Sequence, residues 1–207
     1  YVFKSKQQYF AIFVFIGITL WDFFNKSLIQ SVKVIKANKP IVSKVYIPKF
    51  ILILVKMGVN GFKMFISLLI IVAMLIVWRV PVTYNVIYII PILMTLVVLV
   101  FGCCCFLLHY GVFVEDLSNV LNIALRFLFY LTGIFWNIMD RLPSPYNYYI
   151  GRCNPIAFLL TSARDCVIYG STPHRKLLLL WFVIGLIISA LGVRKIYKNE
   201  NSYVKVI

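Results

Sequence analysis

Charged side chains inside long apolar segments are the residues of this sequence that most suggest a functional site. Asp22 and Lys26 stand four residues apart, acid before base, which is the order that favours an ion pair on a helix. Lys63 and Arg126 lie deep in two other apolar segments. Because a cation inside a membrane costs at least about 2.5–3.5 kcal/mol on insertion scales, Arg126 needs a partner, a watery cavity or an anionic ligand.

Each of these charges also has a purely structural interpretation. Asp22 and Lys26 can neutralise each other near the inner membrane interface without any role in function. Lys56 and Lys63 lie seven residues apart on one helical face, where they either snorkel to the inner head groups or line a polar passage. Lys56 is expected to snorkel, whereas Lys63 lies deeper in its segment and is the better candidate for a passage.

No catalytic or cofactor-binding motif is recognisable. The sequence contains no phosphate-binding loop of the G-x-x-x-x-G-K-[ST] type, and no His/Cys cluster has metal-ligand spacing. Cys103, Cys104 and Cys105 are expected to be packing residues in an apolar run. Asp140 and Asp165 each adjoin an arginine, which favours structural charge pairing. We therefore predict that the chain is not an enzyme by itself and binds neither a metal nor a cofactor.

The composition indicates that the surroundings of the chain are mostly lipid. Apolar residues make up 62% of the 207 residues and charged residues only 13%, against roughly 25% charged residues in soluble domains. The net charge is +15. Since the cations fall between apolar runs, they favour contact with anionic lipid head groups or an anionic substrate. They argue against nucleic acid as a partner.

Five apolar segments are long enough to be transmembrane helices, because a span needs about 20 mainly apolar residues. They cover about residues 9–30, 50–78, 86–109, 117–139 and 177–193. We predict an all-α, polytopic membrane helix bundle with five full transmembrane helices in a single domain over residues 1–207. Five spans place the two termini on opposite sides, and an N-terminus on the outside without a signal peptide would be unusual, so we expect that an earlier span is missing.

Two segments outside the predicted spans indicate the orientation. Segment 31–49 carries five lysines and no acidic residue, so we predict that it is cytoplasmic. Segment 140–176 should then be extracytoplasmic. Within it, Asn154 can cap a helix that begins at Pro155 and ends near Gly170. Such a helix is too short to cross a bilayer, so we expect a re-entrant or interfacial helix on the outer side.

Three longer segments carry a family pattern. In WDFFNKSLIQSVKVIKANKPIVSKVYIPKFILIL the family-like positions are Trp21, Phe23, Phe24, Asn38, Lys44, Val45, Tyr46 and Pro48. The second segment, VFVEDLSNVLNIALRFLFYLTGIFW, has a Glu-Asp pair at 115–116 where the family usually has Arg-Asp. The third, YYIGRCNPIAFLLTSARDCVIYG, has an Asn-Pro start at 154–155 and an Arg-Asp step at 164–165. In this order and spacing they resemble the ABC-2 permeases, the membrane subunits of teichoic acid, O-antigen and capsule exporters.

The resemblance implies a six-span permease that works with a separate ATPase. By this resemblance residues 31–40 would be the coupling helix that docks on the ATPase, with Val32, Lys33, Ile35, Lys36, Asn38 and Lys39 as its candidate contacts. Two copies of the chain would form the path, each with one ATPase subunit. ATP and magnesium would bind to the ATPase alone. The alternative for the basic segment is that it only sets the topology.

The resemblance also implies a function, which is the outward export of a lipid-linked cell-surface polysaccharide across a bacterial cytoplasmic membrane. The candidates for the substrate path are cations that could meet anionic groups and aromatic rings that could stack on sugars: Lys63, Arg126, Tyr130 and Trp136. The candidates on the outer gate helix are Asn154, Pro155, Phe158 and Arg164. The alternatives are an ABC-2 exporter of drugs or lipids and a membrane channel or scaffold without an ATPase.

Overall fold

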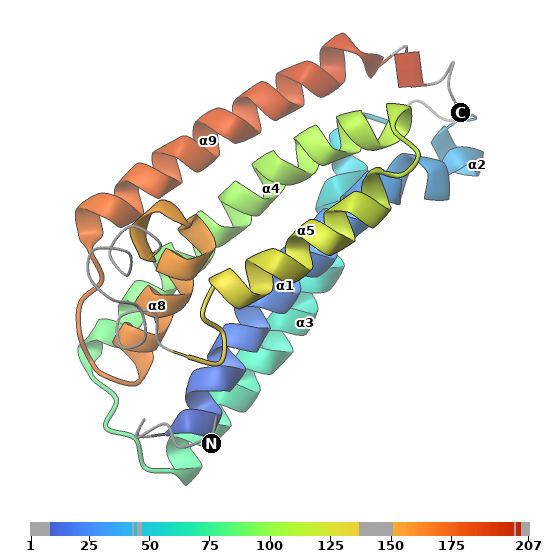
Figure 1. Cartoon of the computed structure of the whole chain (residues 1–207). Coiled ribbons are helices and arrows are strands. Elements are labelled where there is room, and N and C mark those ends of the chain that lie inside the picture. The colour runs from blue at the N-terminus through green and yellow to red at the C-terminus, as the bar shows by residue number, and fades with distance from the viewer. Residues whose placement is uncertain (1–8, 43, 45–46, 137–150, 201, 204–207) are drawn as a thin grey trace.

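The computed structural model describes residues 9–42, 44, 47–136, 151–200 and 202–203, and these residues form a bundle of helices without strands (Figure 1). The elements in chain order are α1 (Phe10–Ala37), α2 (Lys39–Val42), α3 (Lys49–Val77), the 3-10 helix η1 (Tyr84–Tyr88), α4 (Ile89–Phe113), α5 (Leu117–Leu131), α8 (Pro155–Val167) and α9 (Arg175–Lys198). The predicted all-α fold is confirmed.

Four stretches of the described residues are long and apolar enough to cross a membrane: α1, α3, η1 together with α4, and α9. They contain 24 to 30 residues each, against the roughly 20 that a bilayer requires. Large apolar side chains remain exposed along α3 and α9, such as Phe62, Phe65, Leu179 and Ile187. An apolar face without a protein neighbour is what lipid contact favours, so the predicted polytopic membrane bundle is confirmed.

The fourth predicted span, 117–139, is shorter in the structure than expected. Helix α5 has 15 residues, and at 1.5 Å per residue it is about 22 Å long, less than the roughly 30 Å of a hydrocarbon core. It ends where Thr132 Oγ1 donates to the Leu128 carbonyl at 2.6 Å and Gly133 adopts a φ of +66°. Residues 137–139 lie outside the described residues.

Helix α1 lies at the centre of the bundle, in contact with α3, α4, α5 and α8 (Figure 1). Helix α4 runs along α9, and small residues allow their backbones to approach closely. A Cβ atom added at Gly102 would lie 2.9 Å from Ser189 N, and one added at Gly192 would lie 2.6 Å from Cys105 Cβ. Ser189 Oγ also donates to the Val98 carbonyl at 2.9 Å.

The two ends of the bundle hold different parts of the chain. Helix α2 lies at the same end as the C-terminal end of α9, and α8 lies at the other end, near the start of α9 (Figure 1). The described residues of segment 31–49 and residues 151–176 are therefore at opposite ends of the long helices. That the end with α2 faces the cytoplasm stays a prediction. The first part of the predicted outer segment, residues 140–150, lies outside the described residues.

Polar contacts tie the helices together at the end that carries α2. Lys49 Nζ and Glu200 Oε1 form a buried ion pair at 3.3 Å, which joins the start of α3 to the residues after α9. Tyr203, whose side chain is fully buried, places its hydroxyl 2.8 Å from His109 Nδ1 on α4. These contacts fix the ends of α3, α4 and α9 relative to one another.

Candidate functional site

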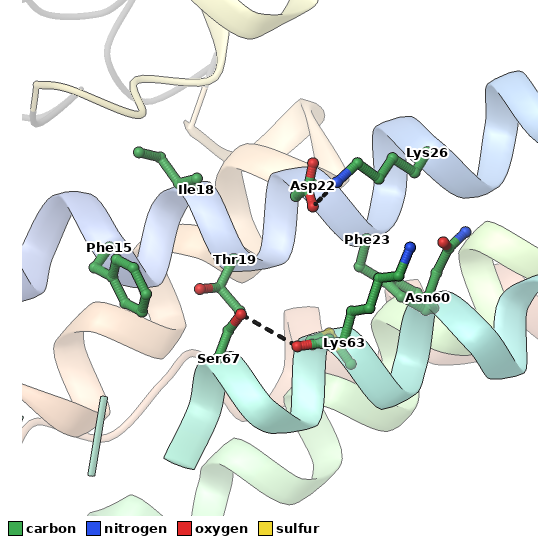
Figure 2. Close-up of a pocket in the computed structure, with 10 residues that line it drawn as sticks. Phe15, Ile18, Thr19, Asp22, Phe23, Lys26, Asn60, Lys63 and Ser67 are labelled. Carbon is green, nitrogen blue, oxygen red and sulfur yellow. Dashed lines mark hydrogen bonds and ion pairs between the residues drawn. The ribbon is translucent and has the colours of Figure 1, made fainter. Parts of the chain in front are cut away.

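The first part of the candidate site is a pocket between α1 and α3, hereafter the α1–α3 pocket (Figure 2). Its volume is about 80 Å³, and it is lined by Phe15, Ile18, Thr19, Asp22, Phe23, Lys26, Asn60, Lys63, Met64 and Ser67. Both helices contribute charged residues from their middle turns. The pocket therefore places polar groups between two helices that are long and apolar enough to cross a membrane.

The predicted Asp22–Lys26 ion pair is present in this pocket. Lys26 Nζ donates to Asp22 Oδ2 at 2.6 Å, and the side chains are 46% and 45% exposed. Asp22 lies twelve residues after Phe10 and fifteen before Ala37, so it is about 18 Å along the helix axis from Phe10 at 1.5 Å per residue. The pair thus lies near the middle of α1, and its place near the inner membrane interface stays a prediction.

The wall opposite the ion pair is formed by α3. Asn60, only 3% exposed, donates from Nδ2 to Ser27 Oγ at 3.2 Å and to Gln30 Oε1 at 3.1 Å. Its Oδ1 atom is buried and has no hydrogen-bond partner among the described residues. One turn further, Lys63 is exposed, and Figure 2 shows its side chain extending from α3 toward α1. Lys63 lies midway along α3, as far from Lys49 as from Val77.

The second part of the candidate site is a groove between α1 and α5, hereafter the α1–α5 groove. Its volume is about 360 Å³, and it is lined by Trp21, Asn25, Ile29, Asn122, Leu125, Arg126, Phe129 and Tyr130. Two of the predicted path residues, Arg126 and Tyr130, lie in this groove. They lie one turn apart on α5, which explains why they share a face.

Aromatic rings form one wall of the α1–α5 groove. The ring of Phe129 lies 5.5 Å from that of Trp21 and 5.7 Å from that of Tyr130, centroid to centroid, in edge-to-face geometry. Trp21 belongs to α1, and its place in this groove was not predicted. Trp136, the remaining predicted stacking residue, lies beyond the end of α5 and does not line this groove.

The pocket and the groove flank the same exposed face of α1. Asp22, Asn25 and Lys26 are three and four residues apart, so they share one side of the helix. Lys63 approaches this side from α3 and Arg126 from α5, and we call these five residues the polar belt. The belt contains three cations and one carboxylate. In a membrane, where charges are weakly screened, this arrangement favours an anionic group.

Helix α8 begins as the sequence predicted. The Oδ1 atom of Asn154 accepts hydrogen bonds from Ile156 N at 3.1 Å and Ala157 N at 3.3 Å, and Pro155 is the first helical residue. Gly170 follows the helix with a φ of +62°. The helix is more buried than an interfacial helix would be, since Phe158 and nine other residues of α8 are buried.

Loss of the Asn154 cap should have a measurable cost. Replacing Asn154 with alanine leaves the amide groups of Ile156 and Ala157 without their acceptor, so we expect a loss of about 0.5–2 kcal/mol of stability. The midpoint of thermal unfolding of the purified chain should fall accordingly. The Asn154→Asp variant keeps an acceptor and serves as the control. Equal midpoints for the alanine and aspartate variants would contradict the capping role.

Arg164 on α8 forms a clamp between three parts of the chain. It is 3% exposed, and its guanidinium donates to the carbonyl oxygens of Phe13 at 3.1 Å, Gly133 at 2.9 Å and Ile134 at 2.7 Å. Its Cζ atom also lies 3.6 Å from the centre of the Phe13 ring. A Cβ atom at Gly17 would overlap this guanidinium, so a larger residue there would displace the arginine from its present position.

The structure changes the interpretation of the Arg164-Asp165 step. Among the described residues Arg164 is hydrogen-bonded to backbone carbonyls, and it forms no ion pair with its neighbour Asp165. Burial lowers the pKa of Arg164 to about 9, so the guanidinium is still charged at neutral pH. Burial raises the pKa of the Asp165 carboxyl to about 6, and the nearby charge of Arg164 opposes this shift. The other predicted pairing, at Asp140, lies outside the described residues.

The predicted coupling segment, residues 31–40, does not form a separate helix in the structure. Residues 31–37 are the last turns of α1, and Val32 and Ile35 are buried within this chain at 4% and 1% exposure. Val32 packs against Gly111 on α4, so little of either side chain is accessible to a partner. Asn38 ends α1 by donating from Nδ2 to the Val34 carbonyl at 2.6 Å. The short helix α2 that follows is a single turn.

The accessible part of this region is a basic surface. Its exposed residues are Lys33, Lys36, Lys39 and Ile41, which we call the α1–α2 surface. Beside it lies a hollow of about 310 Å³ between α1 and the α4–α5 junction, to which Gly111, Glu115 and Ser118 contribute. The glutamate that replaces the arginine of the family pattern therefore lies next to the lysines Lys33 and Lys36.

The described residues contain no group of His, Cys, Asp or Glu side chains that could hold a metal ion. All five cysteines are free thiols. Cys104 and Cys105 are buried between helices, in line with a packing role. The sequence left open whether Cys153 and Cys166 meet, and in the structure Cys153 is exposed while Cys166 is buried on α8.

Comparison with known proteins identifies relatives along the whole chain. No protein-family model matches it. Two relatives, both O-antigen export system permease proteins RfbA from Klebsiella pneumoniae, are 23% and 22% identical over all 207 residues, which cover 79% of each relative. These matches confirm the resemblance to polysaccharide-exporting ABC-2 permeases that the three sequence segments indicated.

Proposed function

Because the chain is related along its whole length to O-antigen export permeases, we propose that it is the membrane-spanning permease subunit of an ATP-driven polysaccharide exporter. It moves a lipid-linked cell-surface glycan, of teichoic acid, O-antigen or capsule type, outward across the cytoplasmic membrane. Two copies form the path, and each binds one ATPase subunit that holds ATP and magnesium. The chain does not hydrolyse ATP itself.

The polar belt is the structural observation that carries this proposal. Charges within a transmembrane helix are costly in contact with lipid, so they often mark a path for polar cargo. Lys63 and Arg126 supply positive charge on either side of α1. The rings of Trp21, Phe129 and Tyr130 supply flat apolar faces beside Arg126, on which sugar rings can stack.

ATP-driven transport also requires a surface of the permease on which the ATPase docks. The α1–α2 surface is suited to this role, because it presents three lysines and the apolar side chain of Ile41 at one end of the bundle. It is directly continuous with α1, which carries Asp22 and Lys26. A movement of the ATPase at this surface would therefore act on the same helix that forms the centre of the belt.

The proposal is tested by purification and reconstitution. A tagged copy of the chain should retain a nucleotide-binding subunit during purification from its own cells. In proteoliposomes, the complex should hydrolyse ATP faster when lipid-linked glycan is added and should move the glycan across the membrane. Stimulation by hydrophobic drugs instead would favour a drug exporter. Purification without any ATPase would favour a channel or scaffold.

The role of Arg126 gives a sharper prediction. Replacing Arg126 with glutamine removes one cation of the belt, so we expect glycan export to slow by roughly tenfold, equivalent to about 1.4 kcal/mol. Export by proteoliposomes is the measurement. ATPase association should be unchanged, since Arg126 lies on α5 away from the α1–α2 surface. Lys56→Gln is the matched control, and equal export by both variants would contradict this role.

A further inference from the structure

We propose that the α1–α3 pocket binds a phosphate ester with a neighbouring hydroxyl group, and that Asp22 acts as the resident counter-ion that holds Lys26 while the pocket is empty. This inference rests on the proposed function, since it names a chemical group of the cargo that the polar belt takes. The phosphate ester can belong to the glycan or to a lipid head group.

The charges of the pocket select an anion. Lys26 and Lys63 face the pocket from two helices, and Asp22 is its one carboxylate among the lining residues. Asp22 already neutralises Lys26 at 2.6 Å, whereas Lys63 forms no ion pair with any of the described residues. An incoming phosphate can attract Lys63 and then compete with Asp22 for Lys26. The pair is half exposed, and exposed ion pairs are weak, so this exchange is feasible.

The buried amide of Asn60 selects a hydroxyl beside the anion. Its Oδ1 atom is buried without a hydrogen-bond partner among the described residues, although buried polar atoms are usually paired. An ionised phosphate offers acceptors only and cannot satisfy another acceptor. A hydroxyl group can donate to Asn60 Oδ1. A phosphate ester of a sugar or of glycerol has both groups within a few bonds of each other.

The volume of the pocket limits what enters it. A cavity needs about 10–15 Å³ of this kind of volume to hold one water molecule, so about 80 Å³ admits a group of several atoms. This accommodates a phosphate with one hydroxyl and excludes a chain of sugars. The rest of the cargo therefore stays outside the α1–α3 pocket.

A resident counter-ion explains why an anion would bind without being trapped. Conduction requires that a site binds its cargo strongly enough to admit it and weakly enough to release it. When the phosphate leaves, Asp22 takes its place beside Lys26 and stabilises the empty state. Asp22 therefore sets the balance between capture and release, while Lys26 and Lys63 make the contacts.

The test is a binding measurement on the full chain in phosphatidylcholine nanodiscs. The probe is a fluorescent short-chain lipid that carries a sugar phosphate, and its dissociation constant is measured for each variant. Asp22→Asn should bind the probe roughly three- to tenfold more tightly, because the phosphate no longer competes with the Asp22 carboxylate for Lys26. Lys63→Gln and Lys26→Gln should bind at least about tenfold more weakly. Lys56→Gln, on the same helix as Lys63 but outside the pocket, should bind like the unchanged chain.

Two further probes separate the parts of the proposal. An alkyl phosphate without a hydroxyl should bind more weakly than the sugar phosphate, because Asn60 Oδ1 gains no donor. Phosphatidylglycerol, whose head group also has a phosphate and neighbouring hydroxyls, is added as a competitor. If phosphatidylglycerol displaces the probe, and its affinity for the variants follows the same order, the site is supported and its ligand is a lipid head group.

The outcomes decide the inference independently of the proposed function. Unchanged or weaker binding by Asp22→Asn would overturn the counter-ion role. If that variant does not fold, Asp22→Glu and Lys26→Gln decide, since the first should bind like the unchanged chain and the second should lose affinity. Equal binding of all lysine variants would overturn the site. A chain that binds in the predicted order but fails to export would contradict the proposed function alone.

Discussion

Arg164→Ala should strongly destabilise the fold. The carbonyl groups of Gly133 and Ile134 would lose their donor in the interior, and each buried polar group left unpaired costs about 1–3 kcal/mol. The cavity left by the guanidinium adds to this. We therefore expect the free energy of unfolding to fall by at least about 3 kcal/mol, with α8 detached from α1 and from the turn after α5.

The expected loss can be measured by thermal unfolding of the purified chain. Arg164→Lys keeps the charge but replaces the planar donor fork with a single ammonium group, so it should recover only part of the stability. Arg175→Ala is the matched control, because Arg175 is an exposed arginine that lies 5.1 Å from the Tyr88 ring. The clamp would be refuted if Arg164→Ala and Arg175→Ala had the same unfolding midpoint.

Local rules of sequence predicted the features that depend on neighbouring residues. The cap at Asn154 and the proline at the first helical position follow from preferences that act within one turn. The Asp22–Lys26 ion pair and the shared groove of Arg126 and Tyr130 follow from helical spacing. These parts of the fold and of the site needed no knowledge of which helices pack together.

Contacts between distant residues could not be predicted in this way. Arg164 binds a carbonyl 151 residues away, and nothing in the local sequence distinguishes it from an arginine that pairs with Asp165. The buried pair of Lys49 and Glu200 also joins distant parts of the chain, and Lys49 resembled the other lysines of its segment. Burial of these charges is decided by the packing of the bundle, which a single sequence does not specify.

The burial of Val32 and Ile35 within the chain was not predicted, for a different reason. An apolar stripe is expected both for a short coupling helix that docks on a partner and for the last turns of a long membrane helix. No glycine or proline separates residues 31–37 from the preceding span, so α1 continues for 28 residues and buries the stripe in its own chain. The first proline is Pro40, which lies in α2, after the end of α1.

The α1–α2 surface leads to the second large prediction, which is that Ile41→Asp should disrupt ATPase association. Ile41 is 49% exposed, so an aspartate there is solvated in the free subunit and should leave its fold unchanged. In the complex the same carboxylate would be buried against the ATPase without a partner, which costs several kcal/mol. We expect the association to weaken by at least about 100-fold, equivalent to roughly 2.7 kcal/mol. Co-purification with the ATPase measures this loss.

Two comparisons make this result specific to the α1–α2 surface. Val82→Asp introduces the same charge at another exposed apolar residue, in the connection between α3 and η1, and should leave ATPase association intact. Ile35→Asp should instead prevent stable folding, because Ile35 is 1% exposed within this chain. If Ile41→Asp retained the ATPase as well as Val82→Asp does, the surface that includes Lys33, Lys36 and Ile41 would not be the docking site, and the coupling would have to run through another part of the chain.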